Sequence, residues 1–396
     1  MAILAINSGS SSLKFSLHPV AQGQVQAELL AGNVQGLEPG GKPHIGWKYR
    51  GQNVQQPLEV ADGRTPFEEA LERLRGLVPM LDKYAPLQAI AHRVVHGGGE
   101  FARSVLVDDA VLERLTQFNS LAPLHQPHNV EGIRRFRKAF PQLPQVACFD
   151  TAFHAGMPEL NYAFALPRNL REQGVRRYGF HGLSYQYILS VLQARSQRAN
   201  DRLVMAHLGN GASLCACQAG ASIATTMGFS ALDGLMMGTR SGSIDAGVLL
   251  YLMEQGWSHA QIETLLYKQS GLLGVSGISA DMRTLRADGS ADAQRAIDQF
   301  THRVVRETAS LVACLQGLDV LAFSGGIGER DAILRQQACE KLAWLGVQID
   351  AERNHRADGR EPCAVHAEGS AVEIWVVPTD EGRVAAREAA ALLLLQ

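Results

Sequence analysis

The sequence lacks several signatures that would assign a nucleotide-binding or membrane class directly. It has no Gly-x4-Gly-Lys-Ser/Thr motif, because Gly40-Gly41-Lys42 continues into Pro43, and this excludes a P-loop protein. The motif set of protein kinases is absent, as is the Gly-x-Gly-x-x-Gly turn of dinucleotide-binding domains after a strand. No apolar run reaches membrane-spanning length, and the N-terminus lacks the basic flank and long apolar core of a signal peptide.

An excess of charge of one sign is also missing, as are paired cysteines. The formal net charge of -2 gives no reason to expect nucleic acid or an anionic membrane as a partner. The six cysteines show no metal-binding spacing, so we expect reduced thiols and a cytoplasmic location. With 396 residues, of which 46% are hydrophobic and 19% charged, the chain is long enough for two domains with sizeable cores.

The first informative segment is a glycine-serine turn near the N-terminus. Residues 3–6 are apolar, residues 7–12 read Asn-Ser-Gly-Ser-Ser-Ser, and apolar residues then alternate over 13–17. This pattern predicts a β-hairpin with Lys14 on the face opposite the apolar residues. Hydroxyls, backbone N–H groups and little side-chain bulk suit the close approach of a polyphosphate, although an ordinary hairpin turn has the same composition.

A second segment near the middle of the chain has the same organisation. Residues 203–208 are apolar apart from His207, and the turn 209–213 reads Gly-Asn-Gly-Ala-Ser before another apolar run. The spacing of about 200 residues is half of the chain, which suggests two related domains that each open with a hairpin. Two such hairpins facing one another can clamp a phosphate chain from both sides.

Three charged residues occupy positions at which α/β proteins often bind ligands. Arg93 stands in the apolar strand expected at 88–96, where an anionic ligand or an acidic side chain must pair with it. Asp150 ends the strand expected at 146–150, and ligands bind at the carboxyl ends of strands. Arg240 is flanked by glycines in a loop, which allows it to reach a ligand or to remain on the surface.

A third glycine-rich turn follows a strand late in the chain. Residues 320–324 predict a strand, residues 325–329 read Gly-Gly-Ile-Gly-Glu, and we expect a helix from about 331. A glycine turn at a helix N-terminus is typical of nucleotide binding, although the signal is weak by itself. Amphipathic spacing also predicts a long helix at about 291–316.

Seven motifs occur in a familiar order between residue 3 and about 385. They are Asn7-Ser-Gly-Ser-Ser-Ser-Leu-Lys14-Phe, His92-Arg93-Val-Val-His-Gly-Gly, Phe149-Asp150-Thr-Ala-Phe-His, Arg177-Tyr-Gly-Phe-His181-Gly, His207-Leu-Gly-Asn-Gly-Ala-Ser, Met237-Gly-Thr-Arg240-Ser-Gly and Ser324-Gly-Gly-Ile-Gly-Glu329. In these motifs the sequence resembles the acetate kinase family, which lies in the superfamily of actin, Hsp70 and sugar kinases.

The resemblance implies an α/β fold with two duplicated ribonuclease H-like domains and an interdomain cleft. It places the expected N-terminal domain at residues 1–151 plus the closing helix 384–396, and the nucleotide-binding C-terminal domain at 152–383. It also implies a cytoplasmic homodimer that acts on small-molecule substrates, with no nucleic acid or membrane partner.

The family's site residues can be carried over onto matching positions of this sequence. The expected catalytic residues are Asp150, His181 and Arg240, and the expected ligands of Mg²⁺, which Mn²⁺ can replace, are Asn7 and Glu381. The expected substrate-binding residues are Arg93, Val95, Leu124, Phe180 and Ala231. The expected contacts of ATP or ADP are Lys14, His207, Leu208, Gly209, Asn210, Gly211, Asp281, Met282, Arg283, Gly326, Ile327, Gly328, Glu329 and Arg330.

The sequence departs from the usual family pattern at four of its positions. Met282 stands where an aromatic residue is common and Arg330 where Asn is common, which affects the nucleoside pocket. Ala231 replaces a usual Pro in the loop before Arg240, and Ser243 replaces a usual Asp. The change at residue 231 concerns the part of the site expected to hold the acyl chain.

The chemistry of a carboxylate acceptor explains the cationic residues. A carboxylic acid with a pKa of roughly 4 to 5 is already ionised at neutral pH, so it needs no general base. It needs relief from repulsion between two anions and alignment with the leaving group. Arg93 and Arg240, together with His181 and Mg²⁺, supply positive charge for this purpose. We therefore interpret Asp150 as an orienting residue, although the family's role for it is proton donor or acceptor.

Three functions remain open at this point. The first is acetate kinase, and the second is a propionate or butyrate kinase, which shares nearly every motif. The third is an ATPase module like that of Hsp70, which would require a separate peptide-binding domain.

Overall fold

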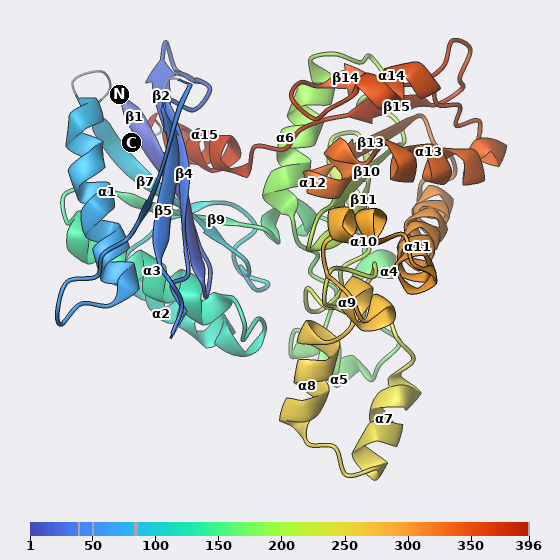
Figure 1. Cartoon of the computed structure of the whole chain (residues 1–396), viewed down its shortest axis with the longest axis horizontal. Helices are drawn as coiled ribbons and strands as arrows, with labels where there is room; N and C mark the ends of the chain where they lie inside the picture. The colour runs from blue at the N-terminus through green and yellow to red at the C-terminus, as the bar shows by residue number, and fades with distance from the viewer. Residues whose placement is uncertain (39, 50, 83–85, 395–396) are drawn as a thin grey trace. The chain divides into compact units, whose positions relative to one another are not determined.

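The computed structural model describes residues 1–38, 40–49, 51–82 and 86–394 of the chain. The chain divides into two compact units, each with its own sheet (Figure 1). The first unit combines Met1–Phe153 with Asp380–Gln396, and the second is His154–Thr379.

A mixed sheet of nine described strands forms the first unit, in the order β6-β5-β4-β2-β1-β7-β9-β8 with β3 paired to β2. The strands are β1 (Ala2–Ser8), β2 (Ser12–Ala21), β3 (Gln24–Val25), β4 (Leu30–Gln35), β5 (His44–Tyr49), β6 (Gln52–Pro57), β7 (Leu87–Val94), β8 (Val105–Leu106) and β9 (Gln145–Phe149). Strands β1, β7 and β9 are parallel neighbours, whereas the other pairs are antiparallel. The carboxyl ends of these three strands therefore meet at one edge, where α/β sheets bind their ligands.

The N-terminal hairpin has the geometry that the sequence predicts. Strands β1 and β2 are antiparallel, with Asn7 opposite Lys14. Phe15 and its apolar neighbours at 13 and 17 are buried, whereas Lys14 is exposed. Since side chains alternate along a strand, the apolar residues fill the core and Lys14 is left on the other face.

Helices cover both faces of this first sheet. The core that contains Phe15 also contains residues of α1 (Pro66–Asp82) and α3 (Gln126–Ala139), so these helices lie on that face. The opposite face is covered by α15 (Glu381–Leu394), which packs on β1, β2, β7 and β9. A Cβ added to Gly382 would collide with Ser16, so glycine permits α15 to approach the sheet closely on the Lys14 face.

The position of α15 shifts the unit boundary slightly from the expected one. The expected second domain, 152–383, includes Glu381, whereas this residue belongs to the first unit in the structure. The helix packs on the first sheet from its beginning. A local pattern of apolar residues predicts a helix but does not indicate the sheet on which it packs.

The second unit contains a sheet of six described strands in the order β12-β11-β10-β13-β15-β14. The strands are β10 (Leu203–Leu208), β11 (Ala212–Gln218), β12 (Ala221–Thr225), β13 (Val320–Ser324), β14 (Cys363–Ala364) and β15 (Glu373–Val376). Strands β10, β13 and β15 are parallel, and β11, β12 and β14 pair antiparallel to their neighbours. This order repeats β4-β2-β1-β7-β9-β8 of the first unit, which confirms the duplication inferred from the two hairpins.

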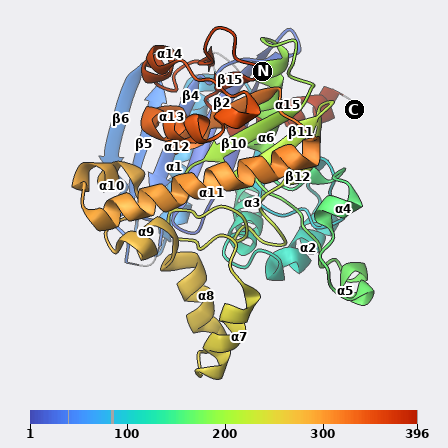
Figure 2. The ribbon, with the colours of Figure 1, turned by 90° about the vertical axis from the view of Figure 1, so that its right-hand side faces the viewer.

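Helices of the second unit surround its sheet and extend beyond it. They are α4 (Glu159–Tyr162), α5 (Arg168–Glu172), α6 (Gly182–Gln193), α7 (Ala246–Glu254), α8 (His259–Lys268), α9 (Gly271–Ser276), α10 (Met282–Asp288), α11 (Ala291–Leu315), α12 (Gly325–Arg330), α13 (Ala332–Lys341) and α14 (Ala351–Arg356). The long helix α11 crosses β10, β11 and β12, whereas α7 and α8 project from the rest of the unit (Figure 2). Within the described residues, no helix combines the length and apolarity needed to cross a membrane.

The glycine segment after β13 differs from its expected conformation. A turn over 325–329 and a helix from about 331 are expected, but these glycines themselves form the short helix α12. A second helix, α13, then begins at Ala332 with Asp331 as its N-cap. Gly325 has a φ of 75°, which only glycine adopts readily, and this allows the chain to turn directly from β13 into α12.

The buried histidine of β7 should make the stability of the protein depend on pH. His92 Nε2 lies 2.6 Å from Gln145 Oε1, and burial, opposed by this hydrogen bond, lowers the pKa of His92 to about 4. Its neutral form therefore favours folding, and this contribution is complete above about pH 6.5 and lost as pH falls toward 4. Between pH 6.5 and 4.5 the wild type should lose about 2 kcal/mol more unfolding free energy than His92→Gln, measured by urea unfolding. The exposed His44→Gln should follow the wild type, and parallel curves for wild type and His92→Gln would contradict the interpretation.

Candidate active site

Arg93 and Asp150 meet at the carboxyl edge of the first sheet. Arg93 lies near the end of β7, and Asp150 directly follows the neighbouring parallel strand β9. Arg93 donates from Nε to Asp150 Oδ1 at 2.9 Å and from Nη2 to Oδ2 at 2.7 Å. Its Nη1 forms an ion pair with Glu381 Oε2 at 2.9 Å, so one guanidinium bridges two strand ends and the start of α15.

The electrostatics of this cluster keep Arg93 charged. Burial alone would lower the pKa of Arg93, but the carboxylates of Asp150 and Glu381 outweigh that effect and raise it above the ordinary value. The Asp150 side chain is only 2% exposed, and both of its oxygens accept from Arg93. One cation and two carboxylates give the cluster a formal charge of −1, which favours an additional cation nearby.

A cavity of about 130 Å³ in the first unit brings four of the expected site residues together. Asn7, Lys14, Arg93 and Glu381 all line it. The amide oxygen of Asn7 and the carboxylate of Glu381 are hard oxygen donors of the kind that Mg²⁺ prefers. In the described part of the chain no three His, Cys, Asp or Glu side chains gather as a metal site.

The residues expected around the acyl chain are divided between the units. Val95 and Leu124 are half-buried in the first unit. Phe180 is buried and Ala231 half-buried in the second. Their assembly into one pocket therefore stays a prediction.

Two histidines stack on one another in the second unit. His207 lies in β10 with Ser213 of β11 as its cross-strand partner. His181 precedes α6 in the left-handed region, with a φ of 59°. The two imidazole rings have centroids 4.3 Å apart and an interplanar angle of 26°. Their Nδ1 atoms each lie 2.8 Å from a serine Oγ, that of Ser213 for His181 and that of Ser184 for His207.

The Nε2 atoms of both histidines lie near the turn between β10 and β11. A Cβ added to Gly211 would lie 3.4 Å from His181 Nε2 and 3.8 Å from Arg240 Nη1. A Cβ added to Gly209 would lie 3.9 Å from His207 Nε2. Because these glycines carry no side chain, the space beside the turn adjoins two imidazoles and a guanidinium. This is a suitable place for an anion.

The loop that carries Arg240 is held by its own backbone and by an ion pair. Arg240 donates from Nη1 to the carbonyl of Ala231 at 2.9 Å. Asp233 accepts from Ser243 Oγ at 2.6 Å and from Arg177 Nη1 at 3.1 Å. Ser243, noted in the sequence as a departure from the family, thus has a structural role in fixing this loop.

A large cavity of about 960 Å³ in the second unit joins three expected nucleotide-binding segments. The expected residues that line it are Gly209, Asn210, Asp281, Met282, Arg283, Gly326, Ile327 and Arg330. The volume is within the range of small-molecule sites. At its rim, Asp281 caps α10, and hydrogen bonds from Arg283 lower the pKa of Asp281 to about 2. Residues that the sequence did not indicate, including Arg286, Asp331, Ile333 and His355, complete the wall.

Other residues expected to contact the nucleotide do not line this cavity. Leu208 and Gly328 are buried. Glu329 is also buried, and its Oε1 accepts from the backbone N–H groups of Gly325 at 2.9 Å and Thr379 at 3.0 Å. These contacts show that Glu329 fixes the turn from β13 into α12. His207 and Gly211 lie instead beside the histidine pair described above.

The fully buried Arg335 of α13 supports the large cavity of the second unit and was not indicated by the sequence. Its Nη1 donates to the carbonyls of Gly328 and Glu329 in α12, at 2.9 and 2.8 Å. Its Nε and Nη2 donate to the side-chain and backbone oxygens of Asn354 in α14, and Nη2 also donates to the carbonyl of Ala357. All five N–H groups are thus used, and two helix ends that border the cavity are joined.

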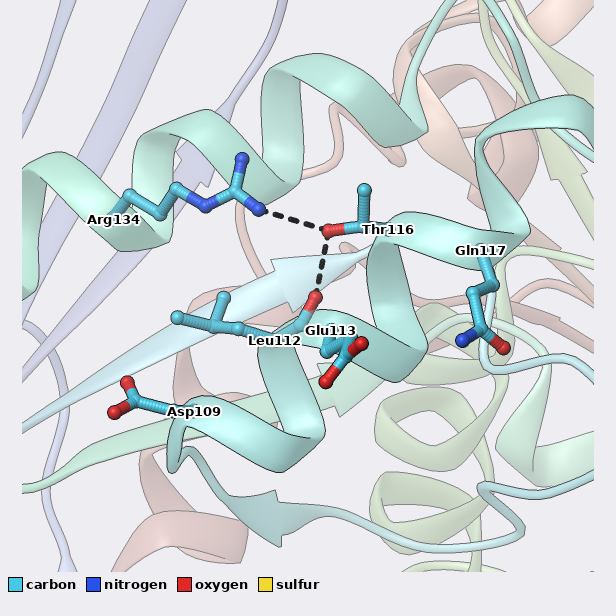
Figure 3. Close-up of a pocket in the computed structure, with 6 residues that line it drawn as sticks. All are labelled: Asp109, Leu112, Glu113, Thr116, Gln117 and Arg134. Atoms are coloured by element: carbon cyan, nitrogen blue, oxygen red, sulfur yellow. Dashed lines mark hydrogen bonds between the residues drawn. The ribbon is translucent and has the colours of Figure 1, made fainter.

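A separate surface pocket of about 590 Å³ lies between α2 (Asp109–Gln117) and α3. The six residues that line it are Asp109, Leu112, Glu113, Thr116, Gln117 and Arg134 (Figure 3). Arg134 donates to Thr116 Oγ1 at 3.0 Å, and Thr116 donates to the carbonyl of Leu112 at 2.7 Å. None of the expected site residues lines this pocket, which therefore lies outside the candidate active site.

Two units with one strand order, glycine turns beside cationic and imidazole side chains, and a cavity of nucleotide size define a two-domain α/β phosphotransferase. The family model described as "Acetokinase family" matches residues 2–387. The chain belongs to the acetokinase family, a kinase family that uses ATP or ADP with a divalent metal ion.

Individual relatives agree with this assignment over nearly their full length. An acetate kinase of Rhodopseudomonas palustris is 48% identical over 389 residues, which cover 97% of this chain and 96% of the relative. The crystal structure of a propionate kinase from Francisella tularensis has a TM-score of 0.89 at 38% identity, with 98% of each chain covered. That of an acetate kinase from Porphyromonas gingivalis has a TM-score of 0.86 at 33% identity, with 100% of each chain covered.

Replacement of Arg335 by lysine should weaken both the fold and the expected nucleotide site. Lysine keeps the charge but has three donors on one atom, so at least two buried carbonyl groups would lose their partners at about 1–3 kcal/mol each. We expect the melting temperature to fall by roughly 5–10 °C and its increase on adding ADP to shrink. As a control, Arg356→Lys alters an exposed ion pair with Glu352 in α14 and should change both values little. If the two variants change the melting temperature and its response to ADP equally, the hydrogen bonds of the Arg335 guanidinium are unimportant.

Proposed function

We propose that the protein catalyses the reversible, Mg²⁺-dependent transfer of the γ-phosphoryl group of ATP to acetate, which yields acetyl phosphate and ADP. The observation that carries the proposal is the half-buried Arg93, ion-paired with Asp150 and Glu381, in a chain whose near-full-length relatives include acetate kinases. An arginine at the end of a central strand provides a fixed cation for a carboxylate acceptor.

Arg93 is assigned to the acceptor because it retains hydrogen-bonding capacity. A guanidinium has five N–H donors, and three of them serve Asp150 and Glu381. The remaining donors can bind the carboxylate of acetate. Asp150 has both oxygens on Arg93, which supports its role as an orienting residue, and an ionised acceptor requires no base.

Phosphate-binding roles are assigned to groups of both units. Lys14 would contact the nucleotide phosphates, and Asn7 and Glu381 would hold Mg²⁺, or Mn²⁺ in its place. When bound, the ion would neutralise charge on the phosphates. The cavity of the second unit would bind the nucleoside, and His181 and Arg240 would stabilise the charge that develops on the transferred phosphoryl group. The acceptor attacks in line with the leaving oxygen, so no covalent enzyme intermediate is required.

We also propose a homodimer that uses the projecting helix α7. Although α7 is rich in apolar residues, none of its nine residues is buried. Leu250, Tyr251 and Met253 are each more than half exposed. Exposed large apolar side chains on one helix are typical of a protein interface, and a second copy of the chain would cover them. The six cysteines are all free, which agrees with a cytoplasmic location.

The activity and the two arginine roles can be tested in one assay. With ATP, Mg²⁺ and acetate, trapping by hydroxylamine should yield acetyl hydroxamate, and none should form without acetate. Arg93→Ala should mainly raise KM for acetate, whereas Arg240→Ala should mainly lower kcat, by on the order of 10²–10³. The control is Arg114→Ala, which replaces an exposed arginine and should leave KM and kcat at the wild-type values. Unchanged acetate kinetics in both site variants would disprove the assignments.

Propionate is the second candidate substrate, because Ala231 stands where the family commonly has proline. Alanine lacks the ring carbons and fixed φ of proline, so the acyl pocket should have space for an extra methylene, worth at most about 0.8 kcal/mol on burial. We expect kcat/KM for acetate and propionate within roughly tenfold of each other, with butyrate poorer.

The matched variant is Ala231→Pro, which retains the carbonyl that accepts from Arg240. It should shift the kcat/KM ratio toward acetate. A wild type that rejects propionate by far more than tenfold would show that the loop has closed over the space.

A further inference from the structure

The buried hydroxyl groups of Tyr185 and Ser213 form a hydrogen-bonded chain that ends at the imidazole of His181. Ser213 Oγ lies 2.8 Å from His181 Nδ1 and 2.5 Å from the phenolic oxygen of Tyr185. Ser213 and Tyr185 are both fully buried. Since a serine hydroxyl has a single proton, it can donate to only one of these two neighbours.

The direction of donation follows from the acidities of the groups. Burial raises the pKa of Tyr185 well above its usual value, so the phenol keeps its proton and needs an acceptor. The serine oxygen at 2.5 Å is suitably placed to accept it. Ser213 then directs its own proton to His181 Nδ1, and this leaves the histidine proton on Nε2.

A neighbouring histidine in the same unit provides an internal example of this arrangement. His154 Nδ1 lies 2.8 Å from Ser222 Oγ, and its Nε2 lies 3.0 Å from the carbonyl of Phe180. A carbonyl can only accept, so His154 must carry its proton on Nε2 while Ser222 donates to Nδ1. The same serine-to-Nδ1 contact therefore occurs here with the tautomer fixed by a second partner.

We propose that Ser213 and Tyr185 are positioning residues that hold His181 as the neutral tautomer with its proton on Nε2. That proton is then directed at the anion beside the Gly209 and Gly211 turn, where Arg240 supplies the positive charge. The identity of the anion as the transferred phosphoryl group rests on the proposed function, whereas the tautomer does not.

The surroundings of His181 favour a neutral donor over a second cation. Its ring stacks on His207 at 4.3 Å, and Arg240 Nη1 borders the same glycine. Another positive charge would be repelled by that guanidinium, and two stacked imidazolium ions would repel each other. A neutral N–H donor can stabilise developing negative charge without these costs.

The tautomer can be measured directly in the full-length protein without ligand. Long-range ¹H–¹⁵N correlation spectra of ¹⁵N-histidine-labelled protein distinguish a protonated from an unprotonated ring nitrogen, and the His181→Gln spectrum assigns the signal. We expect His181 in the wild type to match His154, with Nε2 protonated and Nδ1 not. A proton on Nδ1, or on both nitrogens, would overturn the proposal.

Variants of the hydroxyl chain connect the tautomer to catalysis. Ser213→Ala should release a population with the proton on Nδ1 and lower kcat by roughly tenfold to a hundredfold, with KM for ATP and acetate within about threefold of wild type. Tyr185→Phe keeps Ser213 but removes the phenol that donates to it, so Ser213 is no longer constrained to donate to His181. This variant should change the tautomer population and kcat in the same direction as Ser213→Ala, but by less. Ser222→Ala is the matched control and should alter the spectrum of His154 but not that of His181.

The outcomes separate this inference from the proposed function. A wild type that forms no acetyl hydroxamate but shows the Nε2 tautomer would reject the function and retain the tautomer assignment. If Ser213→Ala leaves both the tautomer and kcat unchanged, Ser213 is not a positioning residue. If Ser213→Ala does not fold, the wild-type spectrum and Tyr185→Phe decide the question.

Discussion

A buried carboxylate has to be matched by positive charge, and the first unit is arranged around this requirement at Asp150 and its half-buried partner Arg93. The carboxylates paired with Arg93 come from the residue after β9 and from the first residue of α15, which are far apart in sequence. Removing one member of such a cluster leaves a buried charge unpaired, at a cost of about 3–5 kcal/mol. The position of α15 and the geometry of the proposed acceptor site thus depend on the same ion pairs.

In the second unit the corresponding edge of the sheet carries mainly uncharged groups. Its strand order repeats that of the first unit, so its hairpin turn also lies at the carboxyl edge of the sheet. Around this turn stand glycines, two imidazoles and buried hydroxyls, with Arg240 as the nearby cation. The duplicated fold supplies equivalent positions, and the side chains at these positions make one unit ionic and the other mainly a set of hydrogen-bond donors.

The sequence predicts those features whose cause is local. Alternating apolar residues and small turns identified both hairpins, and strand-ending polar residues identified Arg93 and Asp150. The resemblance identified the three segments that line the large cavity of the second unit.

The features that the sequence did not reveal depend on distant partners. Arg335 looks like a surface residue of α13, because its partners Asn354 and Ala357 lie in another helix and the loop after it. Glu329 accepts a hydrogen bond from the backbone of Thr379, 50 residues away, and no local pattern indicates this contact. Ser213 and Tyr185 come from a strand and a helix, and neither has a local signature of its link to His181.

The shared strand order also determines which strands lie at the edges of the two sheets. Each duplicated core finishes in an antiparallel strand of only two residues, β8 in one unit and β14 in the other. Such short borders leave few unpaired backbone groups that another chain could extend, and the longer border strand β6 is polar and ends in Pro57. Parallel pairings join distant segments and form slowly, so incompletely folded chains expose sheet borders for longer. At β6, β8 and β14 the architecture therefore limits intermolecular β-pairing during the period in which the protein is most vulnerable to aggregation.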